Sequence, residues 1–260
     1  MWWDKKFTLE HHGDLYERLW GHFLRRHFPE WERFWTHHIV PLTNRIDDQF
    51  AGTDRAKLFK RDDRKIKPGV EHLMMRNYSV FYFLARSCAI VATEPHLFPE
   101  DAFIFLRAAT ENVSQFLNVF AGQLADRLGI DRDKVPKWEN IKNTETVKSI
   151  VAYRDAFVHS ARLGRNPNLS SEFIPKPEHI AKARNSWSYV QGLDEDQFVD
   201  SRRFLAELQR NLMKAINPVW QQVADLMDDC RTSETYLKLY RLENDPSGKY
   251  RPMPLPAKTG

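Results

Sequence analysis

The sequence predicts an all-α protein, built as an up-and-down helical bundle with an aromatic helical arm at its N-terminus. Three observations support this fold class. Apolar residues recur at helical spacing through several long stretches of the 260-residue chain. Proline and glycine mark the ends of several of these stretches. No stretch shows the alternation of apolar and polar residues that is typical of a half-buried strand.

The first 69 residues are expected to form an arm and a linker. Large aromatic residues at helical spacing predict one kinked or two consecutive helices over 14–28 and 30–43, with Pro29 at a favoured first-turn position. The arm either packs on the bundle or a second subunit, or offers a platform on which bases stack. Residues 53–67 contain seven Lys or Arg and three Asp. This linker is either a solvated charged segment or a basic loop that holds a nucleic-acid backbone.

The bundle itself is predicted over residues 70–231, and residues 232–260 are expected to form a short helix and a proline-rich tail. Gly129 ends the second bundle helix, and Pro218 is expected to kink the last one. Irregular links are expected between the helices. The predicted helices cover residues 70–93, 100–128, 143–164, 177–188 and 194–230.

Composition is that of a globular protein, because 42% hydrophobic residues are enough for a substantial core. Cys88 and Cys230 lie in apolar helical contexts and are expected to be reduced core thiols, as in a cytoplasmic protein. The N-terminus lacks the apolar run of a signal peptide, and Arg86 interrupts the most apolar stretch, so no membrane span is expected. A net charge of +4 is compatible with a polyanionic partner but does not by itself indicate RNA.

The sequence motifs of several classes of functional site are absent. The glycine patterns of P-loops and dinucleotide-binding folds are missing, and so are the HExxH, Glu-x-x-His and GxSxG patterns. We therefore expect no cofactor and no metal site. The adjacent histidine pairs at residues 11–12 and 37–38 point in different directions, which disfavours metal binding. Elimination favours acid–base chemistry without a metal, or no chemistry at all.

The candidate catalytic residues lie on the helix that Asn143 or Thr144 caps. Arg154 supplies a guanidinium, which can hold a phosphate in a fork and match its developing charge. His159 supplies an imidazole, which can take a proton from a ribose 2′-hydroxyl or donate one to the leaving oxygen. Asp155 lies four residues before His159 and is placed to fix its tautomer.

The spacing of this pair constrains how the two side chains converge. Five residues place Arg154 and His159 roughly 140° apart around an ideal helix, so they do not share a face. Convergence needs the length of the arginine side chain, a relaxed last turn, or a second copy of the helix across a dimer axis. Arg33 and His38 repeat the spacing, but they lie in a Trp-rich segment before the bundle.

The run YRDAFVH at residues 153–159 resembles the Arg-x4-6-His signature of the HEPN superfamily, in which a polar residue often follows the arginine. The resemblance implies an all-helical and commonly dimeric fold. It also implies a metal-independent ribonuclease in a toxin, phage-defence or RNA-processing role, or else an inactive scaffold or partner-binding module. On this resemblance, Arg154 and His159 are the catalytic pair and Asp155 is their polar companion.

In the same superfamily the helix before the signature often contributes a polar residue to the site. The resemblance therefore implies that Glu111 or Asn112 faces His159. The residues themselves offer a simpler alternative, because Arg107 and Glu111 are spaced for an ion pair along one helix.

The leading functional prediction is a HEPN-like RNA endonuclease in which two signatures face each other across a homodimer. Arg162 and Arg165 are then expected to contact flanking phosphates. One alternative is a catalytically silent helical module whose aromatic arm binds a partner protein, such as an antitoxin. The other is a non-catalytic nucleic-acid binder that uses the basic loop at residues 54–67.

Overall fold

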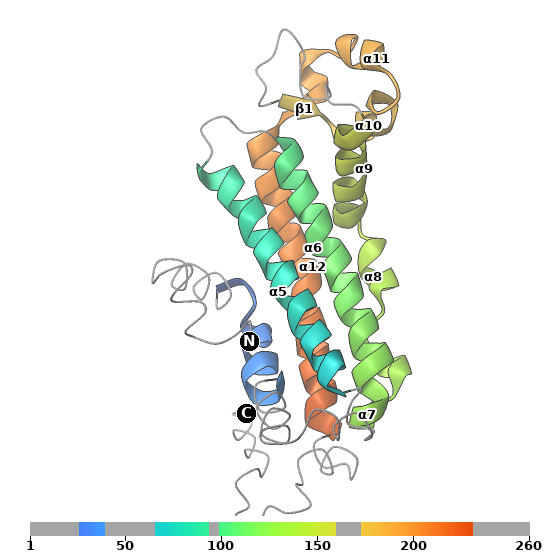
Figure 1. Ribbon diagram of the computed structural model, residues 1–260. Helices are drawn as coiled ribbons and strands as arrows, with labels where there is room; N and C mark the ends of the chain where they lie inside the picture. Colours follow the sequence, from blue (N-terminus) through green and yellow to red (C-terminus); the bar gives the residue numbers. More distant parts are fainter. Residues whose placement is uncertain (1–25, 40–65, 94–98, 160–172, 231–260) are drawn as a thin grey trace, which may run out of the picture. The chain divides into compact units, whose positions relative to one another are not determined.

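The computed structural model describes residues 26–39, 66–93, 99–159 and 173–230 (Figure 1). Within these ranges the chain is mainly helical, and the predicted all-α fold class is confirmed. The two described strands, β1 (Phe173–Pro175) and β2 (Phe198–Asp200), form one short antiparallel pair. Most of the basic loop at 54–67, together with the tail at 232–260, lies outside the described residues.

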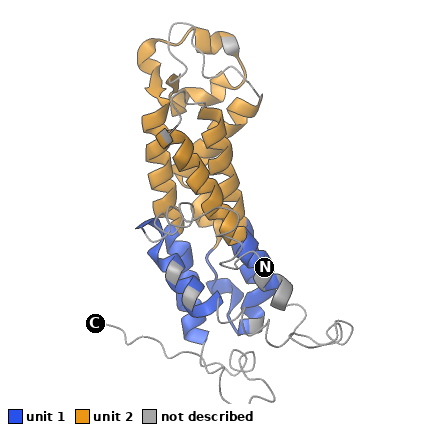
Figure 2. Ribbon diagram, turned by 60° about the vertical axis from the view of Figure 1, so that its left-hand side comes forward, with its two compact units in different colours: residues 1–75, 115–136, 217–260 blue, residues 76–114, 137–216 orange. Residues whose placement is uncertain are grey.

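The residues divide into two compact units (Figure 2). Unit 1 comprises Met1–Met75, Gln115–Pro136 and Asn217–Gly260, and unit 2 comprises Arg76–Ser114 and Lys137–Ile216. The predicted domain boundaries at residues 69 and 231 stay a prediction. Three long helices contribute residues to both units: α5 (Ile66–Thr93), α6 (Pro99–Val119) and α12 (Ser201–Cys230).

Unit 1 has an aromatic core to which the N-terminal arm contributes. Phe28 meets Trp220 edge-on with ring centroids 5.6 Å apart, and Phe34 meets Phe116 edge-on at 5.8 Å. All four side chains are fully buried. The described part of the arm therefore packs on the bundle, as its simpler interpretation predicts. The arm consists of α2 (Pro29–Phe34), with proline at its first position as predicted, and the π-helical turn η1 (Trp35–Ile39).

The second Arg-x4-His pair has a structural role in unit 1. Arg33 Nη2 lies 2.5 Å from a carboxylate oxygen of Asp225, and its Nη1 lies 3.3 Å from Asp228. His38 is fully buried, with Nε2 3.1 Å from the other oxygen of Asp228. His38 lies in η1, and a π-helical turn spans five residues, which favours convergence of side chains at this spacing. Its burial excludes His38 from direct contact with a substrate.

Unit 2 has its own core, in which α6 meets α9 (Glu145–His159) and α12. The Phe103 ring stacks on Tyr153 with centroids 4.8 Å apart, and it lies 5.6 Å from the ring of Phe157. Phe204 of α12 completes the cluster at 5.1 Å from Tyr153. These contacts fix one side of α9 against the body of the unit.

Two predicted helix ends are confirmed in atomic detail. The Thr144 hydroxyl accepts a hydrogen bond from the Val147 backbone N–H at 3.4 Å, which makes Thr144 the N-cap of α9. Gly129 adopts φ 75°, and the Ile130 N–H donates to the Ala125 carbonyl at 2.8 Å. The helix that Gly129 ends runs from α6 through the π-helical segment η3 (Phe120–Ala125) and α7 (Asp126–Leu128).

The structure differs from the sequence prediction at four places. The sequence shows no convincing strand pattern, yet Ile174 pairs with Val199 at the centre of the short β1–β2 pair. The last long helix begins at Ser201, later than the predicted residue 194. The helix predicted at 177–188 is two helices, and the link predicted at 131–142 contains a 3₁₀ turn and a short helix. These elements are α10 (Pro177–Ala183), α11 (Trp187–Gln191), η4 (Arg132–Lys134) and α8 (Trp138–Lys142).

Both cysteines are free thiols, as predicted. Cys230 is buried and Cys88 is partly buried, and this burial raises the pKa of Cys88 to about 11 and that of Cys230 to about 12. Both thiols therefore stay protonated at neutral pH. The helix α12 is continuous across Pro218. Among the described helices, none combines the length and the apolar character needed to cross a membrane.

Candidate functional site

The candidate site is built on α9, which lies beside α6 in unit 2 and has α10 and β1 near its C-terminal end (Figure 1). Its inner side is apolar, with Ile150, Tyr153 and Ala156 fully buried. Its outer side carries Lys148 and Glu145, which pair with each other at 2.8 Å. The apolar contacts hold the helix in place, so its outward side chains have a fixed backbone from which to act.

Arg154 lies at the border between these two sides. Its side chain is 37% exposed, and its Nη1 donates to Oδ1 of Asp155 at 2.9 Å; the Asp155 side chain is 29% exposed. Asp155 thus holds the guanidinium next to it. A guanidinium has five N–H donors, so this ion pair leaves donors for an anion from solvent.

His159 is the last residue of α9, and its side chain lies outside the described residues. The structure therefore brings Arg154 and Asp155 together and places the His159 backbone one turn further along the same helix. The predicted contact between Asp155 and His159 stays a prediction. Arg162 and Arg165 also lie outside the described residues, which resume at Phe173.

Glu111 and Asn112 on α6 have partners close by. Glu111 is exposed and accepts a salt bridge from Nε of Arg107 at 2.9 Å, which is the intrahelical pair that the spacing predicts. Asn112 is buried; its amide nitrogen donates to the Ala108 carbonyl at 2.8 Å, and its Oδ1 accepts from Nη1 of Arg76 at 3.2 Å. Both side chains thus take part in structural contacts. Their predicted role beside His159 stays a prediction.

Tyr153 positions the candidate helix, although no pattern in the sequence marks it as a functional residue. Its hydroxyl donates a 2.5 Å hydrogen bond to the Pro175 carbonyl, and its ring stacks on Phe103. Burial, with the nearby Glu178 carboxylate as the second cause, raises the pKa of Tyr153 well above its ordinary value. The sequence offers one signal for it: a tyrosine within the apolar side of a helix usually has a partner for its hydroxyl.

The chemistry available at this site is that of a positioned cation and an imidazole on one helix. Arg154 can bind a phosphate oxygen, and an imidazole at the helix end can exchange a proton. Among the described residues, no group of three or more His, Cys, Asp or Glu is arranged to hold a metal ion. Comparisons with protein-family models, with curated proteins and with solved structures found no match to this chain.

Proposed function

We propose that this chain is a HEPN-like RNA endonuclease that needs no metal ion. The proposal rests on one observation: the Arg-x4-His segment occupies the end of a single helix whose inner side is anchored in the core and whose arginine reaches the surface. An all-helical fold is what the resemblance to that superfamily implies, and it supports the proposal.

The reaction is a transesterification at phosphorus. The 2′-hydroxyl oxygen of a ribose attacks the adjacent phosphorus and loses its proton, and the bond to the 5′-oxygen of the next nucleotide breaks. His159 takes the 2′-hydroxyl proton or donates a proton to the leaving 5′-oxygen, and water exchanges the other proton. Arg154 holds a non-bridging phosphate oxygen and stabilises the charge that develops there. The products carry a 2′,3′-cyclic phosphate and a 5′-hydroxyl.

The remaining charged residues support this pair. Asp155 keeps the Arg154 guanidinium beside the helix before RNA binds, as their 2.9 Å ion pair suggests. Arg162 and Arg165 contact phosphates on either side of the scissile bond. Because Arg154 and His159 are about 140° apart on an ideal helix, the arginine of one protomer and the histidine of a second form each composite cleft in a homodimer.

Cleavage of RNA in EDTA tests the proposal. Wild-type protein should cut a labelled single-stranded RNA, and His159→Ala and Arg154→Gln should each reduce the rate by about 100-fold or more. His179→Ala is the matched control, because this partly exposed histidine lies on the neighbouring helix α10 and bonds Tyr189. It should cleave like wild type.

Two results would contradict the proposal. If cleavage persists unchanged in His159→Ala, the activity belongs to another group or a contaminant. If wild type and His159→Ala are equally inactive on total RNA and bind it equally, the chain is instead a helical binding module. Circular dichroism of each variant establishes that the helices are intact before either conclusion is drawn.

A further inference from the structure

Unit 2 carries a second surface that the proposed reaction does not use. Tyr82 and Phe83 of α5 and Phe105 of α6 are all partly exposed, and their rings lie against one another. The centroids of Tyr82 and Phe83 are 5.4 Å apart, and those of Phe83 and Phe105 are 6.0 Å apart with nearly parallel planes. We call these three residues together with Arg86 the aromatic–arginine face.

Arg86 gives this face its charge. Its guanidinium carbon lies 5.8 Å from the centre of the Phe105 ring, the geometry of a cation–π contact, and the residue is exposed. Within the described residues no carboxylate pairs with Arg86. By contrast, Arg107, Arg132 and Arg154 each have a carboxylate partner.

The surroundings of the face are also basic. From Arg76 to Thr93 the helix α5 contains two arginines and no acidic residue. Arg76 is exposed and donates to Asn112 across the seam between α5 and α6. On the α6 side, Asp101 lies one turn before Phe105 and is exposed. Among the described residues of α5 from Arg76 onward and of the Phe105 side of α6, two arginines against one aspartate leave a positive charge, which complements a polyanion.

The face is turned away from the candidate catalytic helix. Phe103, which packs on Tyr153 of α9, and Phe105 are two residues apart and therefore roughly 200° apart around α6. A ligand on the aromatic–arginine face thus lies on the side of α6 opposite to α9. It would contact a part of the RNA remote from the bond that is cut.

We infer that the aromatic–arginine face binds single-stranded RNA, with a base stacked on Tyr82 and a backbone phosphate held by Arg86, whose guanidinium the Phe105 ring positions. Partly exposed rings beside an arginine to which the described residues offer no carboxylate are the elements of a stacking platform for single strands. The identity of the polyanion rests on the proposed function, because an RNA endonuclease must hold strands longer than the two nucleotides at the scissile bond.

Binding is measured on the His159→Ala chain, so that cleavage does not consume the probe. The probe is a fluorescent oligouridylate of about 12 nucleotides, followed by anisotropy. Tyr82→Ala, Phe105→Leu and Arg86→Gln should each weaken binding by about tenfold. Arg86→Gln removes only an exposed charge, so it keeps the test valid if an aromatic variant fails to fold.

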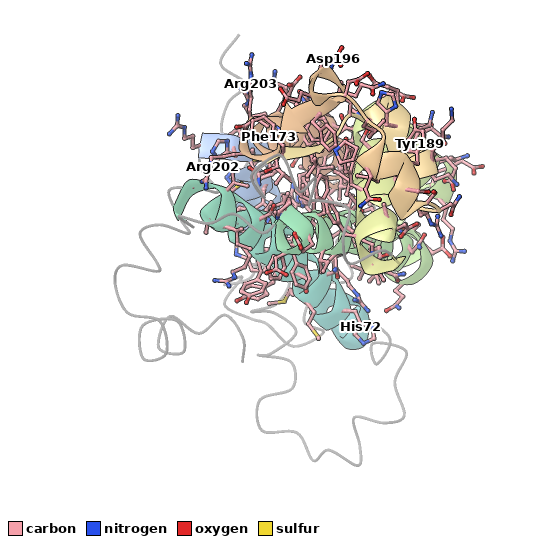
Figure 3. All side chains as sticks on the ribbon, turned by 90° about the horizontal axis from the view of Figure 1, so that it is seen from above. His72, Phe173, Tyr189, Asp196, Arg202 and Arg203 are labelled. Atoms are coloured by element: carbon pink, nitrogen blue, oxygen red, sulfur yellow. The ribbon has the colours of Figure 1, made fainter. Side chains whose placement is uncertain are left out.

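Two matched controls should change the affinity by less than about twofold. Arg210→Gln removes an exposed arginine that bonds the Ala206 carbonyl of its own helix. Tyr189→Ala removes a partly exposed ring that also has a cation beside it, Lys182 Nζ at 5.7 Å. Figure 3 shows Tyr189 on the side of unit 2 away from Arg202. Arg202 donates to the Val91 carbonyl of α5, the helix that carries Tyr82, Phe83 and Arg86.

The same variants in the chain with His159 intact separate this inference from the proposed function. Tyr82→Ala should raise KM for a long RNA about tenfold and leave kcat unchanged, while cleavage of a dinucleotide stays at the wild-type rate. If wild type never cleaves but Arg86→Gln still weakens RNA binding, the proposed function fails and this inference stands.

Two outcomes overturn the inference. In the first, all three face variants bind the oligouridylate as tightly as their parent, whatever the cleavage assay shows. In the second, Tyr82→Ala abolishes a concentration-dependent association of the chain with itself, measured by sedimentation, while RNA affinity is unchanged. The second result would assign the face to a protein contact between copies.

Discussion

At the scale of single residues, Tyr153 ties α9 to the strand pair. Replacing it with phenylalanine keeps the ring on Phe103 but removes the donor to the buried Pro175 carbonyl. We expect Tyr153→Phe to lower the free energy of unfolding by about 1–2 kcal/mol, because that carbonyl loses its partner. Urea denaturation followed by circular dichroism measures the loss. Tyr189→Phe, which removes a partly exposed bond to His179, should cost less.

The raised pKa of Tyr153 gives this prediction a pH dependence. The folded protein keeps the phenol protonated at pH values where the unfolded chain, with a pKa of about 10, releases the proton. This contribution to stability is fully present below pH 10 and is lost as the pH rises above it. The stability gap between wild type and Tyr153→Phe should therefore shrink above about pH 10. A gap that stays constant to pH 11.5 would show that burial does not hold the proton on Tyr153.

At the scale of elements, two glycines on the second long helical segment can be compared: Gly129 ends the segment, and Gly122 lies inside it. Gly129 has φ 75°, where a side chain is strained, so Gly129→Ala should destabilise the protein by about 1 kcal/mol. Gly122 lies inside η3, and a Cβ there would meet nothing within 4 Å. Gly122→Ala should stabilise by about 0.5 kcal/mol, because it restricts the unfolded chain. Thermal unfolding of the pair measures both signs, and destabilisation by Gly122→Ala would contradict this account.

Helix ends set by local chemistry could be predicted from the sequence. Thr144, Gly129 and Pro29 each act on backbone within a few residues, so the pattern around them contains the whole interaction. The Arg107–Glu111 ion pair was predictable for the same reason, since four residues along a helix bring two side chains together.

Elements that depend on distant chain could not be predicted in this way. The last long helix is expected to begin near residue 194, and the Asp194 N–H does donate to the Gln197 side chain at 2.8 Å, a contact typical of a helix start. The structure places a 3₁₀ turn there, η5 (Glu195–Gln197), because the next three residues pair with β1. Three-residue strands are too short to show alternation.

In the candidate site, too, features set by spacing along one helix could be predicted, and contacts that depend on packing could not. The sequence placed Arg154, Asp155 and His159 on one helix, which the structure confirms. It did not predict that the Asp155 carboxylate binds Arg154, because two adjacent residues on an ideal helix do not face each other. Nor did it predict the bond from Arg76 to Asn112, which joins two helices and depends on how they pack. Spacing along the sequence does not determine which side chains of two different helices come into contact.

At the scale of the whole molecule, the proposed composite cleft predicts complementation between two inactive proteins. A protomer with Arg154→Gln keeps its histidine, and a protomer with His159→Ala keeps its arginine. A mixed dimer then contains one cleft with both groups and one cleft with neither. Random pairing makes half of the dimers mixed, so unfolding and refolding the two proteins together should restore about a quarter of the wild-type activity.

Each inactive protein refolded alone is the control, and sedimentation must show the same dimer in all three samples. If the guanidinium and imidazole of one protomer acted together in the same cleft, no mixed dimer would contain a complete site and activity would stay at the level of the controls. Such a result would move the convergence of the pair into a single chain. There the length of the Arg154 side chain and its release from Asp155 would have to close the 140° gap that an ideal helix leaves between the two positions.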